Sequence, residues 1–532
     1  MATFFSSRRL IFGAFVLALL VRLLYVLSIK DCYFFEHLQT EPKHYEEWVR
    51  LIQAGNDPPP PYEQAPGFPY FLSYIGTLAG SLPLSAAYAQ AALGALTCTM
   101  LTAVSLRWFG KGAARSTALI TAFYGPFIYY GGALLPETLF LFLSSSALLA
   151  AALATDFVPR SPREPAPKGE RWWLCSGVLW GLAFYVRPIV LLAVPMLAYD
   201  AYQRGRARAL ARLLAPIALA WSVLVVANYA CSGRFVSTVA SGGENLWLGN
   251  NTLADGVSPF ATGRLDEVAE EVRNRATDAV DANARLGALA LTFMKEQPGA
   301  AVALAAKKLI WSLNDRELPN AGDPTWEQAQ SWLFRIPAFP LSFGPLFMFG
   351  LAGAVLAGPR SPSSRLLGAF VVSGLLTCVV FFSNGRFRLC VAVPLSIWAG
   401  LACDKLFTVV RLRAASPPRA LFAASAACLG ALVAFGNFYG VKDYFVPEIA
   451  VNVGILEERA GSSASALAYL QKGVTANPND VLGRLHLASI LEQSGDNDEA
   501  MRVYATGLRL TPHDETLVSA VGQYLNRHPA SH

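Results

Sequence analysis

The chain has 532 residues, of which 54% are hydrophobic and only 15% carry a charge, whereas a soluble protein carries about 25%. This deficit of charge, together with repeated long apolar runs, excludes an ordinary soluble domain and predicts a polytopic membrane protein. The formal net charge of +6 is small, and its distribution along the chain says more than its size.

The first apolar run, residues 9–29, follows SSRR and has no small-residue cleavage site behind it, so we expect it to remain as a first transmembrane helix. Eleven runs approach the length that crosses hydrocarbon, roughly 17–25 residues. They are 9–29, 84–106, 113–132, 137–154, 172–186, 188–202, 213–230, 340–357, 366–383, 388–403 and 420–439. The pair at 172–202 is short, and a re-entrant hairpin is an alternative there.

Lys and Arg cluster in alternate connections between these runs. The clusters are Arg8 and Arg9; Arg107, Lys111 and Arg115; Arg160, Arg163, Lys168 and Arg171; Arg204, Arg206, Arg208 and Arg212; Arg360 and Arg365; and Lys405, Arg411, Arg413 and Arg419. With a cytoplasmic N-terminus, eleven spans put every cluster in the cytoplasm. The segments at about 30–83, about 231–339 and after 440 are then expected on the extracytoplasmic side.

The eight cysteines show no CxxC spacing, so a zinc site or a redox pair is not expected. Cys32 and Cys231 both lie near predicted outer ends of spans. Spacing alone does not fix a disulfide, and their pairing stays open.

The stretch TEPKHYEEWVRLIQAG, which starts at residue 40, predicts an amphipathic helix on the outer membrane surface. His44, Trp48, Leu51 and Ile52 share one helical face. Glu41 lies in the first turn, where unpaired N–H groups favour a carboxylate. A solvated linker is the alternative interpretation.

Several motifs follow this helix in a recognisable order. They are QAPGFPYFLSYIG, LLPETLFLFL, FYVRPIVLL, SGGENLWLGNNTLADG, AKKLIWSLNDRELPN and NGRFRLCVAVPL. With Glu41 four residues before Tyr45, this order resembles GT-C glycosyltransferases over about residues 5–440. More narrowly, it resembles bacterial relatives of the protein O-mannosyltransferases (dolichyl-phosphate-mannose mannosyltransferase-like proteins) and of the lipid A aminoarabinose transferases. Members of the family usually have Asp where this chain has Glu41.

The resemblance implies an all-α polytopic membrane fold of about 11 transmembrane helices in a bacterial inner (plasma) membrane, with no cofactor. It also implies a polyprenyl-phosphate-linked sugar donor, an inverting single displacement, and Glu41 as the candidate general base. Glu137 is the second catalytic candidate. The alternative role for Glu137 is to cap the helix that starts after Pro136.

Cations at the predicted outer face are candidates for the donor phosphate. Arg187, Arg386 and Arg388 lie in or beside apolar spans, against the positive-inside pattern, and a guanidinium fork suits phosphate oxygens. Lys307 and Lys308 could serve similarly, with a helix that merely lies along the membrane surface as the alternative. Snorkelling to lipid headgroups is the alternative for the arginines.

The candidates for binding the sugar or acceptor are Tyr45, Glu244, Asn245, Trp247 and Asn250, although SGGENLWLGNN also suits a plain loop. No cluster of residues has metal-ligand spacing, so no metal is expected. No Walker-type glycine loop is present, which disfavours a nucleotide-sugar donor. Basic and aromatic residues are not interleaved as they are in proteins that bind nucleic acid.

The end of the chain has a different pattern. Ala466 and Ala500, Leu470 and Tyr504, Gly473 and Gly507, and Pro478 and Pro512 are each 34 residues apart. This period resembles a tetratricopeptide repeat (TPR). We therefore expect a GT-C-like domain over 1–440 and a TPR-like α-helical tail over 441–532, which could recruit a protein partner or acceptor. A plain helical hairpin is the alternative for the tail.

These observations favour an integral-membrane hexosyltransferase that uses a polyprenyl-phosphate sugar. Two other classes stay open: a transporter or flippase of lipid-linked sugars, and a non-catalytic membrane scaffold that presents the repeats. The sequence does not indicate the acceptor.

Overall fold

The computed structural model describes residues 2–56, 60–154, 169–257, 264–320, 322–337, 339–358, 361–412 and 418–528. Within these ranges the chain is helical without a strand, apart from an isolated β-bridge between Tyr124 and Leu341. The expected cytoplasmic residues Arg160, Arg163, Lys168, Arg360 and Arg413 lie outside them.

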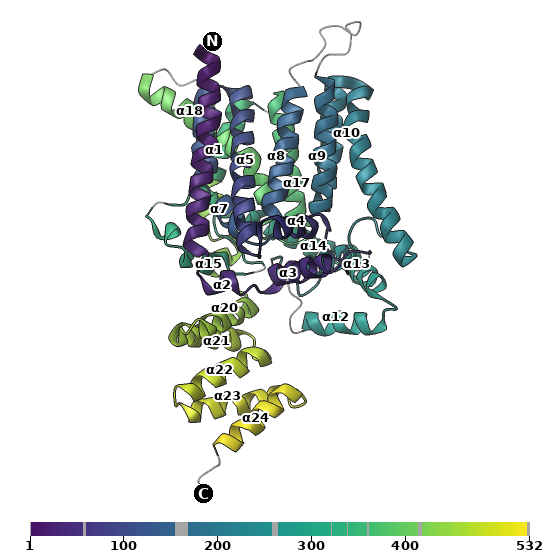
Figure 1. The fold of residues 1–532 in the computed structure, drawn as a ribbon, viewed down its shortest axis with the longest axis vertical. Helices are drawn as coiled ribbons and strands as arrows, with labels where there is room; N and C mark the ends of the chain where they lie inside the picture. The colour runs from purple at the N-terminus through teal and green to yellow at the C-terminus, as the bar shows by residue number, and fades with distance from the viewer. Residues whose placement is uncertain are drawn as a thin grey trace.

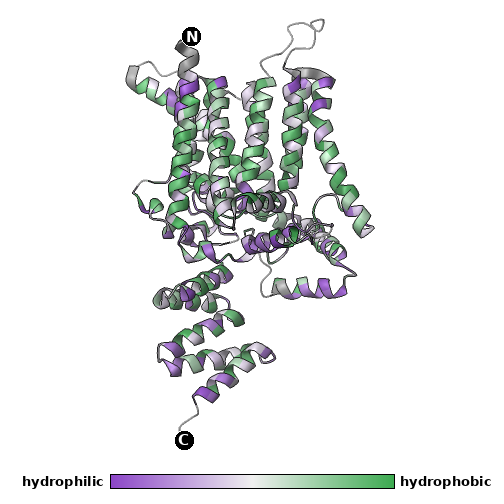
Figure 2. Cartoon of the chain, in the orientation of Figure 1, coloured by the Kyte–Doolittle hydropathy of each residue, from purple (hydrophilic) through white to green (hydrophobic). Residues whose placement is uncertain are grey.

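Six of the described helices are long and apolar enough to cross a membrane. They lie in α1 (Ala2–Ile29), α5 (Leu84–Phe109), α8 (Glu137–Ala154), α10 (Val194–Ser232), α17 (Pro362–Val380) and α18 (Leu389–Leu412). Two shorter apolar helices are α16 (Phe343–Ala357), which packs against α18, and α19 (Pro418–Phe435), which packs against α16. Helix α9 (Glu170–Val186) packs between α8 and α10. Apolar residues dominate this bundle (Figure 2). The all-α membrane fold is therefore confirmed, while the count of eleven spans stays a prediction.

The expected span at 113–132 is not one continuous helix. The chain forms α6 (Lys111–Phe123) and α7 (Gly125–Gly132), which are separated at Tyr124. Pro126 has no N–H group to continue the hydrogen bonds of α6, and it suits the first turn of a new helix. The freed backbone groups are satisfied across the break, since Gly125 N donates to Leu341 O (2.9 Å) and Leu341 N donates to Phe123 O (2.8 Å).

The expected reversal of the chain between 202 and 213 falls inside α10, which follows the 3₁₀ turn η2 (Pro188–Leu192). Val190 lies near the end of α17, beside Thr377, whereas Asp200 pairs with Arg365 at the start of α17 (3.4 Å). Tyr185 Oη at the end of α9 then donates to Ala220 O (2.9 Å), so the chain has returned by residue 220. The two expected runs at 188–202 and 213–230 are therefore antiparallel.

The connecting segments gather at the end of the bundle opposite the N-terminus (Figure 1). They form α2 (Tyr33–Glu36), α3 (Thr40–Gln53), α4 (Gly67–Ala79), α11 (Gly242–Gly249), α12 (Arg264–Arg275), α13 (Ala279–Glu296), α14 (Pro298–Ser312) and α15 (Pro324–Gln330). Cys32 and Cys231 are both free. The side of the membrane that these segments face stays a prediction.

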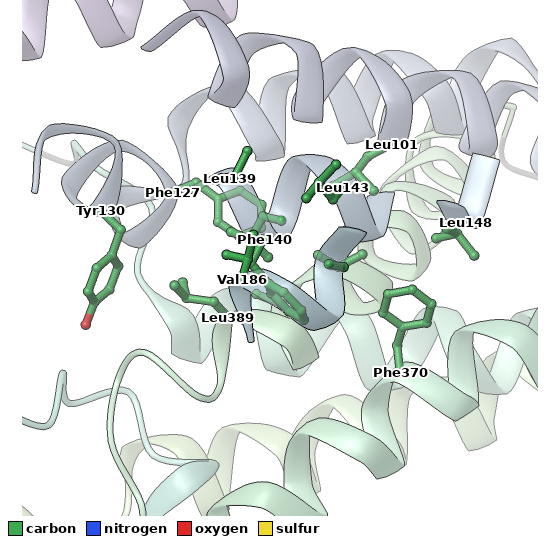
Figure 3. Close-up of a cluster of buried hydrophobic side chains, with 14 of the residues drawn as sticks. Leu101, Phe127, Tyr130, Leu139, Phe140, Leu143, Leu148, Val186, Phe370 and Leu389 are labelled. Atoms are coloured by element: carbon green, nitrogen blue, oxygen red, sulfur yellow. The ribbon is translucent and has the colours of Figure 1, made fainter. Parts of the chain in front are cut away.

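The core of the bundle forms around α8. Leu139, Phe140 and Leu143 of α8 gather with Phe370 of α17 and Leu389 of α18, and all are buried (Figure 3). Helices in lipid associate mainly by close packing, so small residues at their contacts matter.

The tail consists of α20 (Pro447–Arg459), α21 (Ser463–Ala476), α22 (Val481–Gln493), α23 (Asn497–Leu510) and α24 (Glu515–Arg527). A separate apolar core includes Leu470, Leu487, Tyr504 and Leu517. The last three helices, α22, α23 and α24, begin at aspartate caps, as where Asp480 Oδ1 accepts from Gly483 N (2.7 Å). The tail is therefore a folded unit of stacked helices.

Polar contacts tie the tail and the preceding segment to the connecting segments. Trp326 Nε1 donates to Glu457 Oε1 (2.7 Å), and Tyr444 Oη donates to Asp255 Oδ2 (2.6 Å). Arg316 donates to the carbonyl oxygen of Tyr444 (2.5 Å). These bonds hold α20 against the end of the bundle.

The contact between α16 and α18 gives a test of this packing. A methyl group at Gly353 would overlap the carbonyl oxygen of Trp398, whereas one at Gly368 would meet nothing within 4 Å. Gly353→Ala should lower the free energy of unfolding by about 1–3 kcal/mol, as overpacking does. Gly368→Ala is the matched control and should be neutral or stabilising, because Ala is the better helix former. Thermal unfolding of the purified variants in detergent measures both; equal midpoints would contradict this packing.

Candidate active site

Glu41 lies in the first turn of α3, and Tyr45 follows one turn later. Pro42 suits this position because the first N–H groups of a helix have no partner within it. Tyr45 is buried edge-on against Phe68 (ring centroids 5.0 Å) and donates a hydrogen bond to Glu41 Oε1 (3.1 Å). Tyr45 therefore orients the carboxylate of Glu41 from within the same helix.

Arg386 joins Glu41 to Glu137. Arg386 lies in the turn before α18, and Glu137 is the first residue of α8 after Pro136. Arg386 Nε donates to Glu137 Oε1 (2.8 Å), and both side chains are almost fully buried. Its Nη2 donates to Glu41 Oε1 (3.0 Å) and its Nη1 to Glu41 Oε2, which makes a two-pronged pair.

Arg187 completes this arrangement. It lies between α9 and η2, where Pro188 ends the helix, and its Nη2 is 2.6 Å from Glu137 Oε1. We call Glu41, Glu137, Arg187 and Arg386 the charged cluster. Its two positive and two negative formal charges cancel, which reduces the cost of burying them.

The charged cluster sets the protonation state of Glu41. Burial by itself raises the pKa of this carboxyl, but the charge of Arg386 and the hydrogen bonds it donates outweigh burial and lower the pKa below its ordinary value. Arg187 and Tyr45 act in the same direction. Glu41 is therefore ionised at neutral pH.

Arg388 and Lys307, two other phosphate candidates, have different partners. Arg388 is buried, with Nη2 2.5 Å from Glu317 Oε1 and its guanidinium 4.4 Å from the ring centroid of Phe343. Lys307 lies over the ring of Trp311, 4.3 Å from its centroid. The structure does not bring these two into the charged cluster.

The candidates in α11 and after it contact other residues of the protein and not the charged cluster. Glu244 pairs with Arg273 (2.7 Å), and Asn245 N donates to Ser241 O (3.0 Å) within the helix. Trp247 is buried in a small apolar core of the loops. Asn250 donates to Leu246 O (2.8 Å) and Val380 O (2.7 Å). These contacts support the loop itself, so we do not carry the four residues into the proposed site.

Lys308, which the sequence offers beside Lys307 as a candidate cation, is buried among polar groups of the protein. Its Nζ donates to Asn250 Oδ1 (2.9 Å) and to the carbonyl oxygens of Val379 (2.9 Å) and Phe381 (2.8 Å). Burial lowers the pKa of Lys308 to about 8. The two lysines are adjacent in the motif AKK, and the sequence does not indicate which of them is buried, because burial depends on tertiary contacts.

Sequence reasoning missed Arg22, which did leave a signal. It interrupts the apolar run of α1, and an ionisable residue within a span usually faces the protein interior. Arg22 is buried and donates to Ala18 O (3.1 Å), Cys98 Sγ (3.2 Å) and Thr121 O (3.4 Å). It therefore joins α1 to α5 and α6.

Two family models match the chain. Residues 63–230 match the family described as dolichyl-phosphate-mannose-protein mannosyltransferase, and residues 459–524 match the tetratricopeptide repeat. The expected resemblance is thus confirmed for these two segments. The first match contains Glu137 and Arg187, while Glu41 and Arg386 lie outside it.

The chain is also similar to solved structures, at low sequence identity. One is the archaeal oligosaccharyltransferase AglB from Archaeoglobus fulgidus, in complex with an inhibitory peptide and a dolichol-phosphate (16% identity, 90% of this chain, TM-score 0.46). This chain spans only 59% of that protein's length. Another is ArnT from Cupriavidus metallidurans bound to undecaprenyl phosphate (14% identity, 79% of this chain and 87% of the other, TM-score 0.35). The comparison with curated proteins found no match.

The burial of the charged cluster predicts that removing one member destabilises the fold. Glu137→Gln leaves two buried guanidinium groups with one carboxylate, and breaking a buried pair in this way costs about 3–5 kcal/mol. The matched control is Glu46→Gln, which breaks the partly exposed pair with Arg50 (3.0 Å) and should cost about 1 kcal/mol or less. Thermal unfolding in detergent should show a clearly lower midpoint for Glu137→Gln alone. Similar midpoints for the two variants would contradict the arrangement.

Proposed function

We propose that the protein is an integral-membrane glycosyltransferase. It moves a sugar, in our proposal a hexose, from a polyprenyl-phosphate donor to an acceptor hydroxyl on the extracytoplasmic side. The observation that carries the proposal is the buried Arg386 between two carboxylates, Glu41 and Glu137, at the end of the bundle where the connecting segments gather. The family match over residues 63–230 supports the reaction class.

The reaction is an inverting single displacement. The acceptor oxygen forms a bond to the anomeric carbon while the bond from that carbon to the phosphate oxygen breaks. The electron pair of the broken bond leaves with the polyprenyl phosphate, and the acceptor proton passes to the carboxylate of Glu41. A positioned general base typically accelerates such a step by about 10²–10⁴-fold.

Arg386 and Arg187 are the proposed phosphate ligands. A phosphate that approaches Arg386 competes with Glu41 for the same guanidinium fork, because both anions accept two parallel hydrogen bonds. Glu137 binds Arg386 through Nε and keeps the side chain in place. Donor binding would therefore release Glu41 from Arg386 and raise its pKa, which makes it a stronger base when the donor is present.

The role of Glu41 is tested by substitution. Glu41→Gln should lower turnover at least about 100-fold, the low end for a lost general base, whereas Glu41→Asp should be much milder because it keeps the carboxylate. The assay incubates purified protein with a panel of polyprenyl-phosphate sugars and measures release of the sugar-free lipid phosphate. Glu46→Gln on the same helix is the control and should keep normal turnover.

Near-normal turnover of a folded Glu41→Gln variant would remove Glu41 as the base. Transport of an intact donor without bond cleavage would instead identify a flippase. If the folded protein neither cleaves nor transports any of these lipid-linked sugars, the result would favour a non-catalytic scaffold.

A further inference from the structure

A pocket lies where the tail meets the bundle, and we call it the junction pocket. Its walls come from the outer end of α1, from α2, from the end of α7 and the residues after it, and from α15 and α20. The residues that matter below are Tyr129, Asp323, Trp326, Glu327 and Asn452. Figure 1 shows α2, α15 and α20 together at this end of the bundle.

The floor of the pocket carries an unusual carboxyl group. Glu327 Oε2 accepts a hydrogen bond from the hydroxyl of Tyr129 (2.7 Å). A side chain at position 322 would overlap Glu327 Oε1, so the glycine there allows the carboxyl to take this place. Burial raises the pKa of Glu327 to about 7, although the bond from Tyr129 opposes the shift. Glu327 can therefore either accept or donate a hydrogen bond near neutral pH.

The tail completes the pocket. Ile449, Asn452, Val453 and Leu456 of α20 form one wall. The hydrogen bond from Trp326 to Glu457 joins this wall to α15. The pocket therefore exists only when the tail is docked on the bundle.

The junction pocket is close to the charged cluster along the chain at two places. Gln39 and Pro42 line the pocket and flank Glu41 at the start of α3. Tyr129 lines the pocket, while the next residue, Tyr130, faces Gly385, the residue before Arg386. Glu41 itself binds Arg386 and does not line the pocket. A molecule in the pocket would therefore contact the start of α3 on either side of Glu41 in the sequence.

The chemistry of the lining selects the ligand. The described residues that line the pocket include two carboxyl groups, Asp323 and Glu327, but no Lys or Arg, which disfavours a phosphorylated or otherwise acidic ligand. Carboxyl and amide groups accept and donate hydrogen bonds to hydroxyls, and the indole of Trp326 offers an apolar face. This combination fits a neutral, hydroxyl-rich ring.

We propose that the junction pocket is a subsite of the acceptor site: it takes a neutral sugar residue of a glycan, next to the residue whose hydroxyl reacts at Glu41. The proposal rests on the proposed function, which it deepens by naming the acceptor class. It gives the tail a direct role, because α20 supplies part of the site.

Direct binding without a donor tests the site. The full chain in lipid nanodiscs is applied to arrayed neutral oligosaccharides, acidic oligosaccharides and hydroxyl-bearing peptides. The wild type should bind neutral oligosaccharides preferentially. Glu327→Gln, Trp326→Ala and Asn452→Leu should each weaken that binding about tenfold or more, as the loss of a hydrogen bond or a ring contact does. Trp332→Ala is the matched control for Trp326→Ala, since Trp332 is half-exposed and lies outside the pocket, and it should bind as the wild type does.

Binding of undecaprenyl phosphate is measured on the same samples and should be unchanged in all four variants. Glycan binding without lipid-phosphate binding would support the pocket while contradicting the proposed function. No neutral glycan bound by the wild type, a preference for acidic glycans or peptides, or equal binding by the wild type and the pocket variants would overturn the proposal.

Discussion

The structure depends on one buried arginine that two carboxylates hold in place. Arg386 pairs with Glu41, which is 345 residues earlier in the chain, and with Glu137, and Arg187 shares the second carboxylate. A buried guanidinium without these partners would cost several kcal/mol, so α3, α8, the end of α9 and the turn before α18 must converge at one place. A network of this kind also fixes a unique arrangement, because each missing partner leaves an uncompensated charge.

The segment that carries Arg386 is itself tightly held. Lys308 binds the carbonyl oxygens of Val379 and Phe381 at the end of α17, and Ser312 shares a hydrogen bond with Ser383 (2.7 Å). Nδ2 of Asn384, the residue after Ser383, donates to Oδ1 of Asn320 (3.0 Å). The buried polar groups of α14 and the following loop thus position the turn. In our account they act on the donor site through Arg386 and not through direct contact with the substrate.

Much of the fold follows from sequence patterns that reflect local physics. Long apolar runs and the 34-residue period predict the helices of the bundle and of the tail, and Pro136 and Pro188 mark the helix ends beside Glu137 and Arg187. The partners of the charged residues do not follow, because Arg386 and Arg388 are two residues apart in the same motif and yet pair with different carboxylates. The break at Tyr124 depends on a backbone bridge to Leu341, and the buried state of Lys308 depends on carbonyl groups of α17. Neither contact leaves a periodic signal in the sequence.

The central claim is that the donor phosphate displaces Glu41 from Arg386. An experimental structure of the full chain with bound undecaprenyl phosphate tests this most directly. The account predicts that Arg187 and Arg386 bind the phosphate, that Glu137 keeps its bond to Arg386 Nε, and that the two-pronged pair between Arg386 and Glu41 is broken. A phosphate bound by Arg388 or Lys307, with the pair between Glu41 and Arg386 intact, would contradict it.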